Sequence, residues 1–527
     1  MKPEKHIRII ARLDVKGPNV IKGVQFECLR VMGKPSDLAQ EYYAQGADEL
    51  IYLDTVASLY QRNNLLNIVK EASKNIFIPF TAGGGVRTIE DIRALLTAGA
   101  EKVAINTAAT KNPDLIRKAA RTFGSQCIVV SIEAKKKENG SWEAYTDNGR
   151  QSTGLDAIKW AKKAESLGAG EILLTSVDME GTERGLDLEL IREITKTVSI
   201  PVIASGGANS PDNIADAFKK TGADAVAVAS ILHYQKYDID GIKKILTKEK
   251  IPVRQIANSK KIKTASIQSK TITANYNNYT LQHLSGQTGL PADQFNPVKS
   301  SQAGPPKEEL NRTIPIGIID YKINNALSVQ RAFQKIGQTA CIISTPQEVM
   351  KAKALILPGV GAFHDGMRAL KKYGLIEPIK EKVQQGSPLL GICLGMQMLF
   401  SESSEFGRHQ GLRLIEGKVI PLKSPTEVRQ VNYKLPHIGW NRISSTAKRK
   451  WDGTLLEKLS DPSVYYVHSY YPQIKNKKLV LAITEYGRQK FCAVVQKDNI
   501  TGTQFHPEKS GEAGLQILKN FVNLINK

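Results

Sequence analysis

The sequence lacks the features that mark membrane and secreted proteins. In 527 residues no uninterrupted apolar run approaches the roughly 18 residues of a membrane-spanning helix. The first residues, MKPEKHIR, lead into a strand-like stretch without the apolar core of a signal peptide. The few cysteines form no Cys-x-x-Cys motif: Cys28, Cys127, Cys341, Cys393 and Cys492. Their scatter argues against a disulfide framework or a zinc site, so we expect a cytoplasmic protein with no metal, no other cofactor and no membrane partner.

Acidic residues are scarce relative to basic ones. The sequence has 73 Lys and Arg against 51 Asp and Glu, a formal net charge of +22. Such a charge can indicate a nucleic-acid partner. The lysines, however, are spread over many helix-like segments, and no basic stripe with interleaved aromatic residues is present. We therefore expect no nucleic-acid partner and interpret the charge as a basic surface that attracts a phosphorylated substrate.

The first half of the sequence, residues 1–256, alternates β-rich runs with helix-like segments. The runs cover residues 7–15, 49–54, 76–82, 102–106, 127–134, 171–177, 200–206 and 225–230. This alternation is typical of parallel βα units. Eight such units within about 250 residues predict a (β/α)8 TIM barrel.

This half also repeats itself. The motif IPFTAGGG at 78–85 is echoed by IPVIASGG at 200–207, and LDVK at 13–16 by IEAK at 132–135, an offset of roughly 120 residues. Each predicted half-barrel has a glycine-rich loop after its third strand and a small polar sequence after its fourth. Exposed backbone N–H groups of such loops bind phosphate, so two cradles imply an elongated bisphosphate substrate. The candidate substrate-binding residues are Lys22, Gly84, Gly85, Asn106, Thr107, Gly181, Gly206, Gly207, Ala229 and Ser230.

Two carboxylates are expected on opposite sides of the barrel mouth. Asp14 ends the first predicted strand and Glu133 ends the fifth. In a ring of eight strands these positions face each other across the C-terminal rim, where TIM-barrel active sites lie. We predict an acid/base pair acting on a substrate held between the two cradles.

The composition changes after the barrel. Residues 257–312 contain few large aliphatic side chains and several Pro, Gly and Ser residues, which is typical of a linker. A new βα pattern begins near residue 313 and runs to 527, with strands expected at 316–320, 340–344, 354–358 and 389–393. This pattern predicts an open α/β sheet.

A nucleophile motif stands at the end of the last of these strands. In LLGICLGMQ, residues 389–397, Cys393 is flanked by glycines two positions away on either side, as in a strand-to-helix nucleophile elbow. A lone cysteine in an apolar run is more often a core residue. Downstream, GTQFHPE at 502–508 supplies His506 and Glu508, and upstream LPGVG at 357–361 supplies a glycine-rich turn for an oxyanion. Together these motifs predict a Cys-His-Glu hydrolase.

The three motifs resemble those of class I glutamine amidotransferases. The further motifs PGVGAF, HIGWN, HSY and HPEKS resemble the glutaminase subunit of imidazole glycerol phosphate synthase, from about residue 313 to the C-terminus. The resemblance implies that Cys393 is the nucleophile, His506 the base and Glu508 the residue that orients it. It also implies that glutamine and the oxyanion are bound by Gly359, Val360, Gly361, Leu394, Gln397 and Ser510.

Residues 6–256 resemble the cyclase subunit of the same synthase, on motifs such as RIIA at 8–11, INTA at 105–108 and ASGG at 204–207. The resemblance implies that ammonia from glutamine crosses the barrel and cleaves a phosphoribosyl-formimino aminoimidazole carboxamide nucleotide. The products are imidazole glycerol phosphate and aminoimidazole carboxamide ribotide. The implied ammonia gate is Arg8, Glu49, Lys102 and Glu171, and the implied interface pair between barrel and glutaminase is Glu101 with Lys509.

Two departures from the family keep alternatives open. The family has Asp where this sequence has Glu133, and Asp-Gly-Arg where it has Gly17-Pro18-Asn19. Misplacement of a catalytic group by ~1 Å can cost ~100-fold in rate. One alternative is therefore a paralogous ammonia-supplying enzyme that amidates a surface-polysaccharide sugar. Another is a binding or regulatory protein with a degenerate barrel.

Overall fold

The computed structural model describes residues 6–55, 57, 65–255, 314–323, 325–423, 433–446 and 451–526. The linker expected at 257–312 lies outside the described residues and stays a prediction. Residues 1–255 and 313–527 together form one compact unit.

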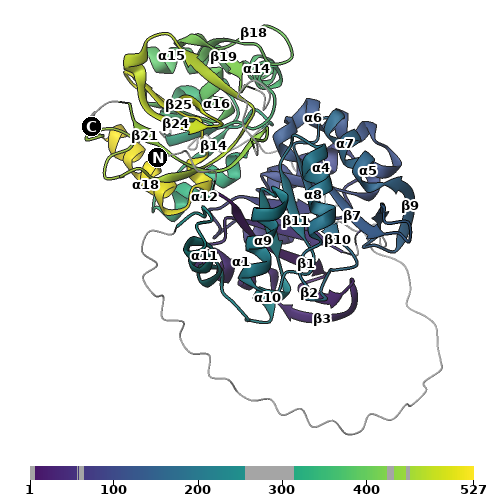
Figure 1. Ribbon diagram of the computed structural model, residues 1–527. Helices are drawn as coiled ribbons and strands as arrows, with labels where there is room; N and C mark the ends of the chain where they lie inside the picture. The colour runs from purple at the N-terminus through teal and green to yellow at the C-terminus, as the bar shows by residue number, and fades with distance from the viewer. Residues whose placement is uncertain are drawn as a thin grey trace, which may run out of the picture. The chain divides into compact units, whose positions relative to one another are not determined.

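The first domain is a closed barrel of eight parallel strands (Figure 1). In ring order these are β1 (Arg8–Lys16), β4 (Glu49–Asp54), β5 (Phe80–Gly83), β6 (Lys102–Ile105), β7 (Ile128–Lys136), β10 (Glu171–Ser176), β11 (Val202–Ser205) and β12 (Ala225–Val228). The ring closes because β12 pairs in parallel with β1. The predicted TIM barrel is confirmed.

Helices connect the strands on the outside of the ring. They are α1 (Pro35–Ala44), α3 (Leu65–Ala72), α4 (Ile89–Ala98), α5 (Thr107–Lys111), α6 (Asp114–Phe123), α7 (Ala157–Ser166), α8 (Leu188–Thr197), α9 (Pro211–Thr221), α10 (Ser230–His233) and α11 (Ile239–Lys248), with the 3-10 turn η1 (Ser125–Cys127). Several begin at side-chain caps; Thr88 and Asp91 form a capping box at the start of α4.

Side chains of a barrel strand point alternately into and out of the barrel, and this alternation determines which residues fill the interior. An apolar cluster fills the interior and consists of Ile10, Ile51, Ala104, Val129, Leu173, Ile203, Ala225 and Ala227. Because side chains alternate along a strand, Arg8 lies on the same side of β1 as Ile10 and one layer below it, and Arg12 and Asp14 lie above it. The charged groups at the two ends of the barrel are thus separated by an apolar cluster.

The third predicted strand begins later than expected, at Phe80 instead of residue 76. Pro79 lacks the N–H group that a sheet ladder needs. The apolar side chain of Phe77 instead packs into a core cluster of the C-terminal domain. The prediction was wrong there because Ile76 and Ile78 are apolar for packing in the barrel core outside the strand, and Phe77 is apolar for contact with the other domain.

Two hairpins were not predicted. They are β2 (Asn19–Val24) with β3 (Glu27–Gly33) after the first barrel strand, and β8 (Trp142–Thr146) with β9 (Gln151–Asp156) after the fifth. Both extend strands at the C-terminal rim, β1 through β2 and β7 through β8. They occupy equivalent positions in the two half-barrels and border the mouth.

The second domain is built on an open α/β sheet. Its strand order is β14 (Cys341–Ile343), β13 (Ile314–Ile319), β15 (Ala352–Leu357), β16 (Leu389–Ile392), β26 (Ile500–Thr503), β25 (Gln489–Lys497), β24 (Val480–Tyr486) and β21 (Ser444–Ser445). The first five strands are parallel. The associated helices are α12 (Ala326–Lys335), α13 (Pro346–Lys351), α14 (Phe363–Lys372), α15 (Ile376–Gln384), α16 (Leu394–Met398) and α18 (Gly511–Ile525).

Two smaller sheets complete this domain. One joins β18 (His409–Gln410), β17 (Phe400–Ser403), β19 (Ile415–Pro421) and β23 (Tyr470–Ile474), and the other pairs β20 (His437–Arg442) with β22 (Ser463–His468). The 3-10 turns η3 (Lys477–Leu479) and η4 (Pro507–Lys509) precede β24 and α18. Among the residues described here, no helix is long and apolar enough to cross a membrane.

The β20–β22 pair carries the packing between the two domains. Ile438, Trp440, Tyr465 and Val467 belong to the same core cluster as the outer face of the barrel. The indole N–H of Trp440 donates to the backbone carbonyl of Asp48 at 3.1 Å. The glutaminase-like domain is therefore packed on the N-terminal end of the barrel strands.

Candidate active site

Cys393 lies in a strained turn between β16 and α16. Its φ of 53° falls in the left-handed region that non-glycine residues rarely adopt. A Cβ atom at Gly395 would collide with the carbonyl oxygen of Leu357, and one at Gly391 would lie 2.8 Å from the backbone nitrogen of Met396. Both glycines of the motif are therefore needed for the close approach of strand and helix, as the elbow prediction required.

His506 and Glu508 face the elbow from the end of β26. The Nδ1 atom of His506 lies 2.7 Å from Oε1 of Glu508, and both side chains are buried. Burial alone would lower the pKa of His506, but the carboxylate of Glu508 and the neighbouring Cys393 raise this pKa well above its ordinary value. The arrangement places an imidazolium beside the sulfur of Cys393, the two groups that react in a cysteine hydrolase.

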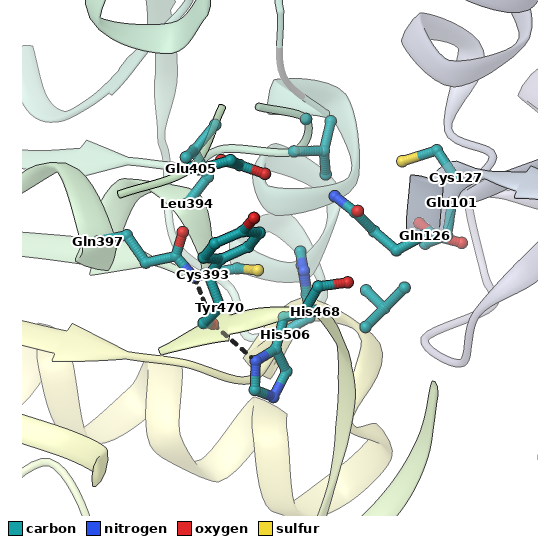
Figure 2. A pocket seen from close by; sticks show the side chains of 14 residues that line it. Glu101, Gln126, Cys127, Cys393, Leu394, Gln397, Glu405, His468, Tyr470 and His506 are labelled. Atoms are coloured by element: carbon teal, nitrogen blue, oxygen red, sulfur yellow. Dashed lines mark hydrogen bonds between the residues drawn. The ribbon is translucent and has the colours of Figure 1, made fainter. Parts of the chain in front are cut away.

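A pocket surrounds Cys393 and His506 (Figure 2). Four of the predicted glutamine- or oxyanion-binding residues line it: Val360, Gly361, Leu394 and Gln397. Gly359 and Ser510, which were also predicted, are not among the lining residues. Ser510 supports the His506 turn, because its hydroxyl donates to the carbonyl oxygen of His506 and accepts the backbone N–H of Tyr465.

Barrel residues contribute to the same pocket: Glu101, Gln126 and Cys127. Glu101 forms the predicted ion pair with Lys509, at 2.8 Å, and accepts a hydrogen bond from Asn325 at 3.0 Å. The pocket that holds the nucleophile therefore extends to the floor of the barrel.

The pocket has an acidic residue that sequence reasoning missed. Glu405 is buried in the loop after β17 and accepts the backbone N–H of Phe363 at 2.7 Å. Burial raises the pKa of Glu405 to about 7. A carboxylate in this lining suits the α-ammonium group of an amino acid. Glu405 is one of two acidic residues in the segment SESSEF, and nothing in the spacing distinguishes it from Glu402.

The predicted gate residues form a closed ring of ion pairs at the barrel floor. Arg8 contacts Glu49 at 2.9 Å and Glu171 at 2.6 Å, and Lys102 contacts the same two carboxylates at 2.7 and 2.6 Å. All four side chains are almost fully buried. Two cations and two anions cancel, so the ring closes the barrel floor without net charge.

At the opposite end, the structure places Asp14 and Glu133 on the facing strands β1 and β7. Glu133 lines a cavity of about 630 Å³ together with the predicted first cradle, Gly84, Gly85, Asn106 and Thr107. Asp14 and Lys22 line an adjoining pocket. Thr55 and Asn148 line both spaces. Asp14 and Glu133 thus border two adjoining pockets at the mouth of the barrel.

Glu133 is held by the turn between β8 and β9. Its Oε2 accepts the backbone N–H of Gly149 at 2.9 Å. Burial raises the pKa of Glu133 to about 7, although the Gly149 N–H and the charge of Arg12 act in the opposite direction. A carboxyl group with this pKa can both donate and accept a proton at neutral pH.

The second predicted cradle lies at the same rim, after β10, β11 and β12. A Cβ atom at Gly181 would collide with the carbonyl oxygen of Gly23 in the β2–β3 hairpin, and one at Gly207 with that of Gly185. Ala229 and Ser230 stand at the start of α10. Gly206 is the remaining member, with φ of 100°. These glycines are thus required by close backbone packing.

Arg12 is a second residue that sequence reasoning missed. It is 2% exposed and donates to Asp14 at 2.9 Å and to the hydroxyls of Thr175 and Ser205 at 3.0 Å each. Lys22 is likewise engaged, because it forms an ion pair with Glu180 and lies 3.9 Å from Asp14. The available signal was an arginine on the same side of β1 as Asp14 and two positions before it.

Comparisons with known proteins agree with this geometry. A family model described as histidine biosynthesis protein matches residues 8–238, and one described as glutamine amidotransferase class-I matches residues 318–524. The imidazole glycerol phosphate synthase subunit HisF of Legionella pneumophila is 64% identical over 202 residues, which cover 38% of this chain and 95% of that protein.

Further HisF subunits match nearly the whole barrel. That of a Dehalococcoides mccartyi strain is 51% identical over 247 residues, covering 47% of this chain and 97% of the relative. That of a Hydrogenobaculum species is 51% identical over 247 residues, covering 47% and 98%. The chain therefore belongs to the HisF family of histidine biosynthesis proteins through its barrel and to the class-I glutamine amidotransferases through its C-terminal domain.

Proposed function

We propose that this chain is a bifunctional imidazole glycerol phosphate synthase that uses glutamine as its ammonia source. The observation that carries the proposal is that the glutaminase pocket reaches the floor of the barrel. The pocket of Cys393 includes barrel-floor residues such as Glu101 and Gln126, and the barrel ends in a mouth with two carboxylates. One chain thus joins a glutaminase to an ammonia-consuming site.

In the glutaminase half-reaction the thiolate of Cys393 attacks the amide carbon of glutamine. The imidazolium of His506 gives its proton to the leaving ammonia, then takes a proton from the water that releases glutamate. Glu508 keeps the imidazole oriented through its 2.7 Å contact. The N–H groups of the turn at 359–361 and of Leu394 are the candidate donors to the oxyanion.

Ammonia then needs a route away from bulk water, where it would be protonated and lose its nucleophilicity. The ring of Arg8, Glu49, Lys102 and Glu171 would open to admit it, and the apolar cluster above would carry the neutral molecule. Ammonia emerging at the mouth would attack the formimino nucleotide, whose phosphates bind at the glycine-rich loops.

Asp14 and Glu133 would exchange protons with the substrate on its two sides. Asp14 forms an ion pair with Arg12 at 2.9 Å and lies 3.9 Å from the ammonium group of Lys22. Glu133 has a pKa of about 7 because of burial, which suits a proton donor. Ring closure and bond cleavage would yield imidazole glycerol phosphate and aminoimidazole carboxamide ribotide.

A second candidate function is supported by Arg12. Its guanidinium is buried and engages Asp14, Thr175 and Ser205, so Asp14 is already paired before any substrate enters the barrel mouth. An enzyme whose barrel only conducts ammonia to another acceptor, such as a surface-polysaccharide sugar, would tolerate this arrangement. The two candidates share the glutaminase and differ at the barrel mouth.

Expression in a bacterial strain that lacks its own synthase separates the two candidates. We expect growth without histidine, at a rate set by the amount of protein. The control is the Cys393→Ala variant, which should support growth only at high external ammonium. No growth with a folded protein that still hydrolyses glutamine would overturn the histidine-pathway function and favour ammonia delivery to another acceptor.

A further inference from the structure

A pair of buried histidines lies beside the glutaminase pocket and has no role in the chemistry described so far. His437 on β20 is fully buried, and His468 at the end of β22 lines the pocket of Cys393. The ring of His437 lies between two tyrosine rings. Its centroid is 3.8 Å from that of Tyr486 and 4.8 Å from that of Tyr466, with interplanar angles of 15° and 18°.

The two imidazoles belong to a line of short polar contacts. Nδ1 of His437 lies 3.1 Å from Nε2 of His468. At one end, Nε2 of His437 lies 2.8 Å from Oδ1 of Asn441. At the other end, Nδ1 of His468 lies 2.9 Å from the carbonyl oxygen of Tyr470. All four ring nitrogens are thus within hydrogen-bond distance of a partner.

Both ends of this line are hydrogen-bond acceptors. The carbonyl oxygen of Tyr470 can only accept. The amide nitrogen of Asn441 donates to the carbonyl oxygen of Glu485 at 3.1 Å, so its Oδ1 faces His437 as an acceptor. Turning the amide over would bring two oxygens together at Glu485. Three contacts therefore need three protons, whereas two neutral imidazoles carry only two.

We propose that His437 is a buried imidazolium that acts as a positioning residue for the glutaminase, holding His468 as the neutral tautomer with its proton on Nδ1. In this arrangement His437 donates both N–H groups, one to Asn441 and one to His468. His468 then donates its single N–H to the carbonyl of Tyr470. The two tyrosine faces stabilise the cation by cation–π attraction.

The groups around the two histidines fit a charged His437 beside a neutral His468. Burial lowers the pKa of His468 to about 4, an effect that the Tyr470 carbonyl opposes and the charge of His506 reinforces. His468 is therefore neutral, and the third proton belongs to His437. The phenols of Tyr466 and Tyr486, whose rings stack on His437, have pKa values that burial raises well above 10, so neither phenol supplies a negative charge.

The line continues from Tyr470 to the nucleophile. The Tyr470 carbonyl also accepts from Nε2 of Gln397 at 2.8 Å, and the same Nε2 lies 3.2 Å from Oε1 of Gln504. Because Oε1 of Gln504 accepts there, its Nε2 faces Sγ of Cys393, at 3.7 Å, as a donor. A continuous series of hydrogen bonds thus links the imidazolium at His437 to Sγ of Cys393.

Proton positions in the wild-type enzyme test the proposal directly. Neutron diffraction, or nitrogen-15 NMR of histidine-labelled protein with its 8 histidines assigned, should find both ring nitrogens of His437 protonated at pH 7. His468 should carry a proton on Nδ1 alone. A neutral His437 at pH 7 would overturn the proposal, whatever the barrel's substrate proves to be.

The functional consequence is measured on Cys393 itself. In the variant His437→Gln, which can donate to His468 but carries no charge, alkylation of Cys393 by iodoacetamide at pH 7 should slow about tenfold, with the rate–pH curve moved up by about one unit. The accessible thiols are first removed as Cys28→Ser and Cys341→Ser. Glutaminase kcat should fall with little change in KM.

The matched variant is Asn441→Leu, which removes the acceptor of one N–H of the imidazolium and should give the alkylation curve of His437→Gln. The control is His409→Gln, a histidine on β18 that does not line the pocket, which should retain the wild-type alkylation curve. Equal alkylation curves for wild type and a folded His437→Gln variant would contradict the link to Cys393. Because the readout is the thiol and not the barrel product, failure here is distinguishable from failure of the proposed synthase activity.

Discussion

Replacing Cys393 by Ala should abolish glutamine-dependent synthesis and leave ammonia-dependent synthesis at the barrel intact. The nucleophile is lost, and neither His506 nor Glu508 can form the thioester in its place. Removal of a covalent nucleophile from a catalytic triad costs about 10⁶-fold in kcat. Ammonia added to the solution bypasses this step, because the barrel chemistry needs only neutral NH3. Product formation with glutamine and with ammonium salts at pH 8.5 measures the two activities separately.

The matched control is Cys341→Ser. Cys341 is a half-exposed thiol on β14 outside the pocket and should be dispensable. Both activities should remain within about twofold of wild type, since surface substitutions away from special features have small effects. Loss of both activities in a folded Cys393→Ala protein would refute the separate roles assigned to the two domains.

The second large effect is expected at Glu133. The variant Glu133→Gln should lose most of the barrel activity, because a general acid or base contributes about 10²- to 10⁴-fold. The same variant should be more stable than wild type above pH 7. Activity is measured with ammonia as substrate, and the free energy of unfolding by urea titration between pH 4 and pH 8.5.

The sign of the stability effect follows from the direction of the pKa shift. The pKa of Glu133 rises from 4.5 to about 7 on folding, so the folded protein binds the proton more tightly. The associated stability is present below pH 4.5 and is lost as the pH rises through 7, an effect of about 3 kcal/mol. The Gln side chain of the variant stays neutral, so the variant loses no such stability as the pH rises. The free energies of unfolding of the wild type and of Glu133→Gln should therefore differ little at pH 4 and most at pH 8.

The conservative variant Glu133→Asp separates charge from geometry. It keeps the carboxyl group and shortens the side chain by one methylene, so ammonia-dependent activity should stay within about tenfold of wild type, or ~1.4 kcal/mol. If Glu133→Gln kept full activity, Glu133 would not be an acid/base group of the reaction.

The parts of this structure that sequence could predict depend on local backbone geometry and on repetition. Gly391 and Gly395 mark the elbow because close backbone approach excludes any Cβ there, and that requirement is visible in the motif itself. Asp14 and Glu133 were assigned to facing strands because the internal repeat gave the strand count. The gate ring followed from family resemblance, and its four side chains do meet.

What could not be predicted depends on contacts between distant segments. Glu405 has no periodicity or spacing of its own, and it reaches the pocket only because β17 lies next to Phe363. The histidine pair likewise acquires its proton count from Asn441 and Tyr470, which tertiary packing brings to its two ends. Phe77 was assigned to a strand because the contact that buries it comes from the other domain.

The measurement that tests the central claim most directly is isotope retention with purified enzyme. The enzyme is given amide-15N-labelled glutamine, the formimino nucleotide and a large excess of unlabelled ammonium at pH 7.5, and the nitrogen isotope in the imidazole product is determined. If ammonia passes from Cys393 through the barrel to Asp14 and Glu133, the product should carry the label almost completely. A product with the isotope composition of the bulk ammonium, or no imidazole product despite glutamine hydrolysis, would contradict the account.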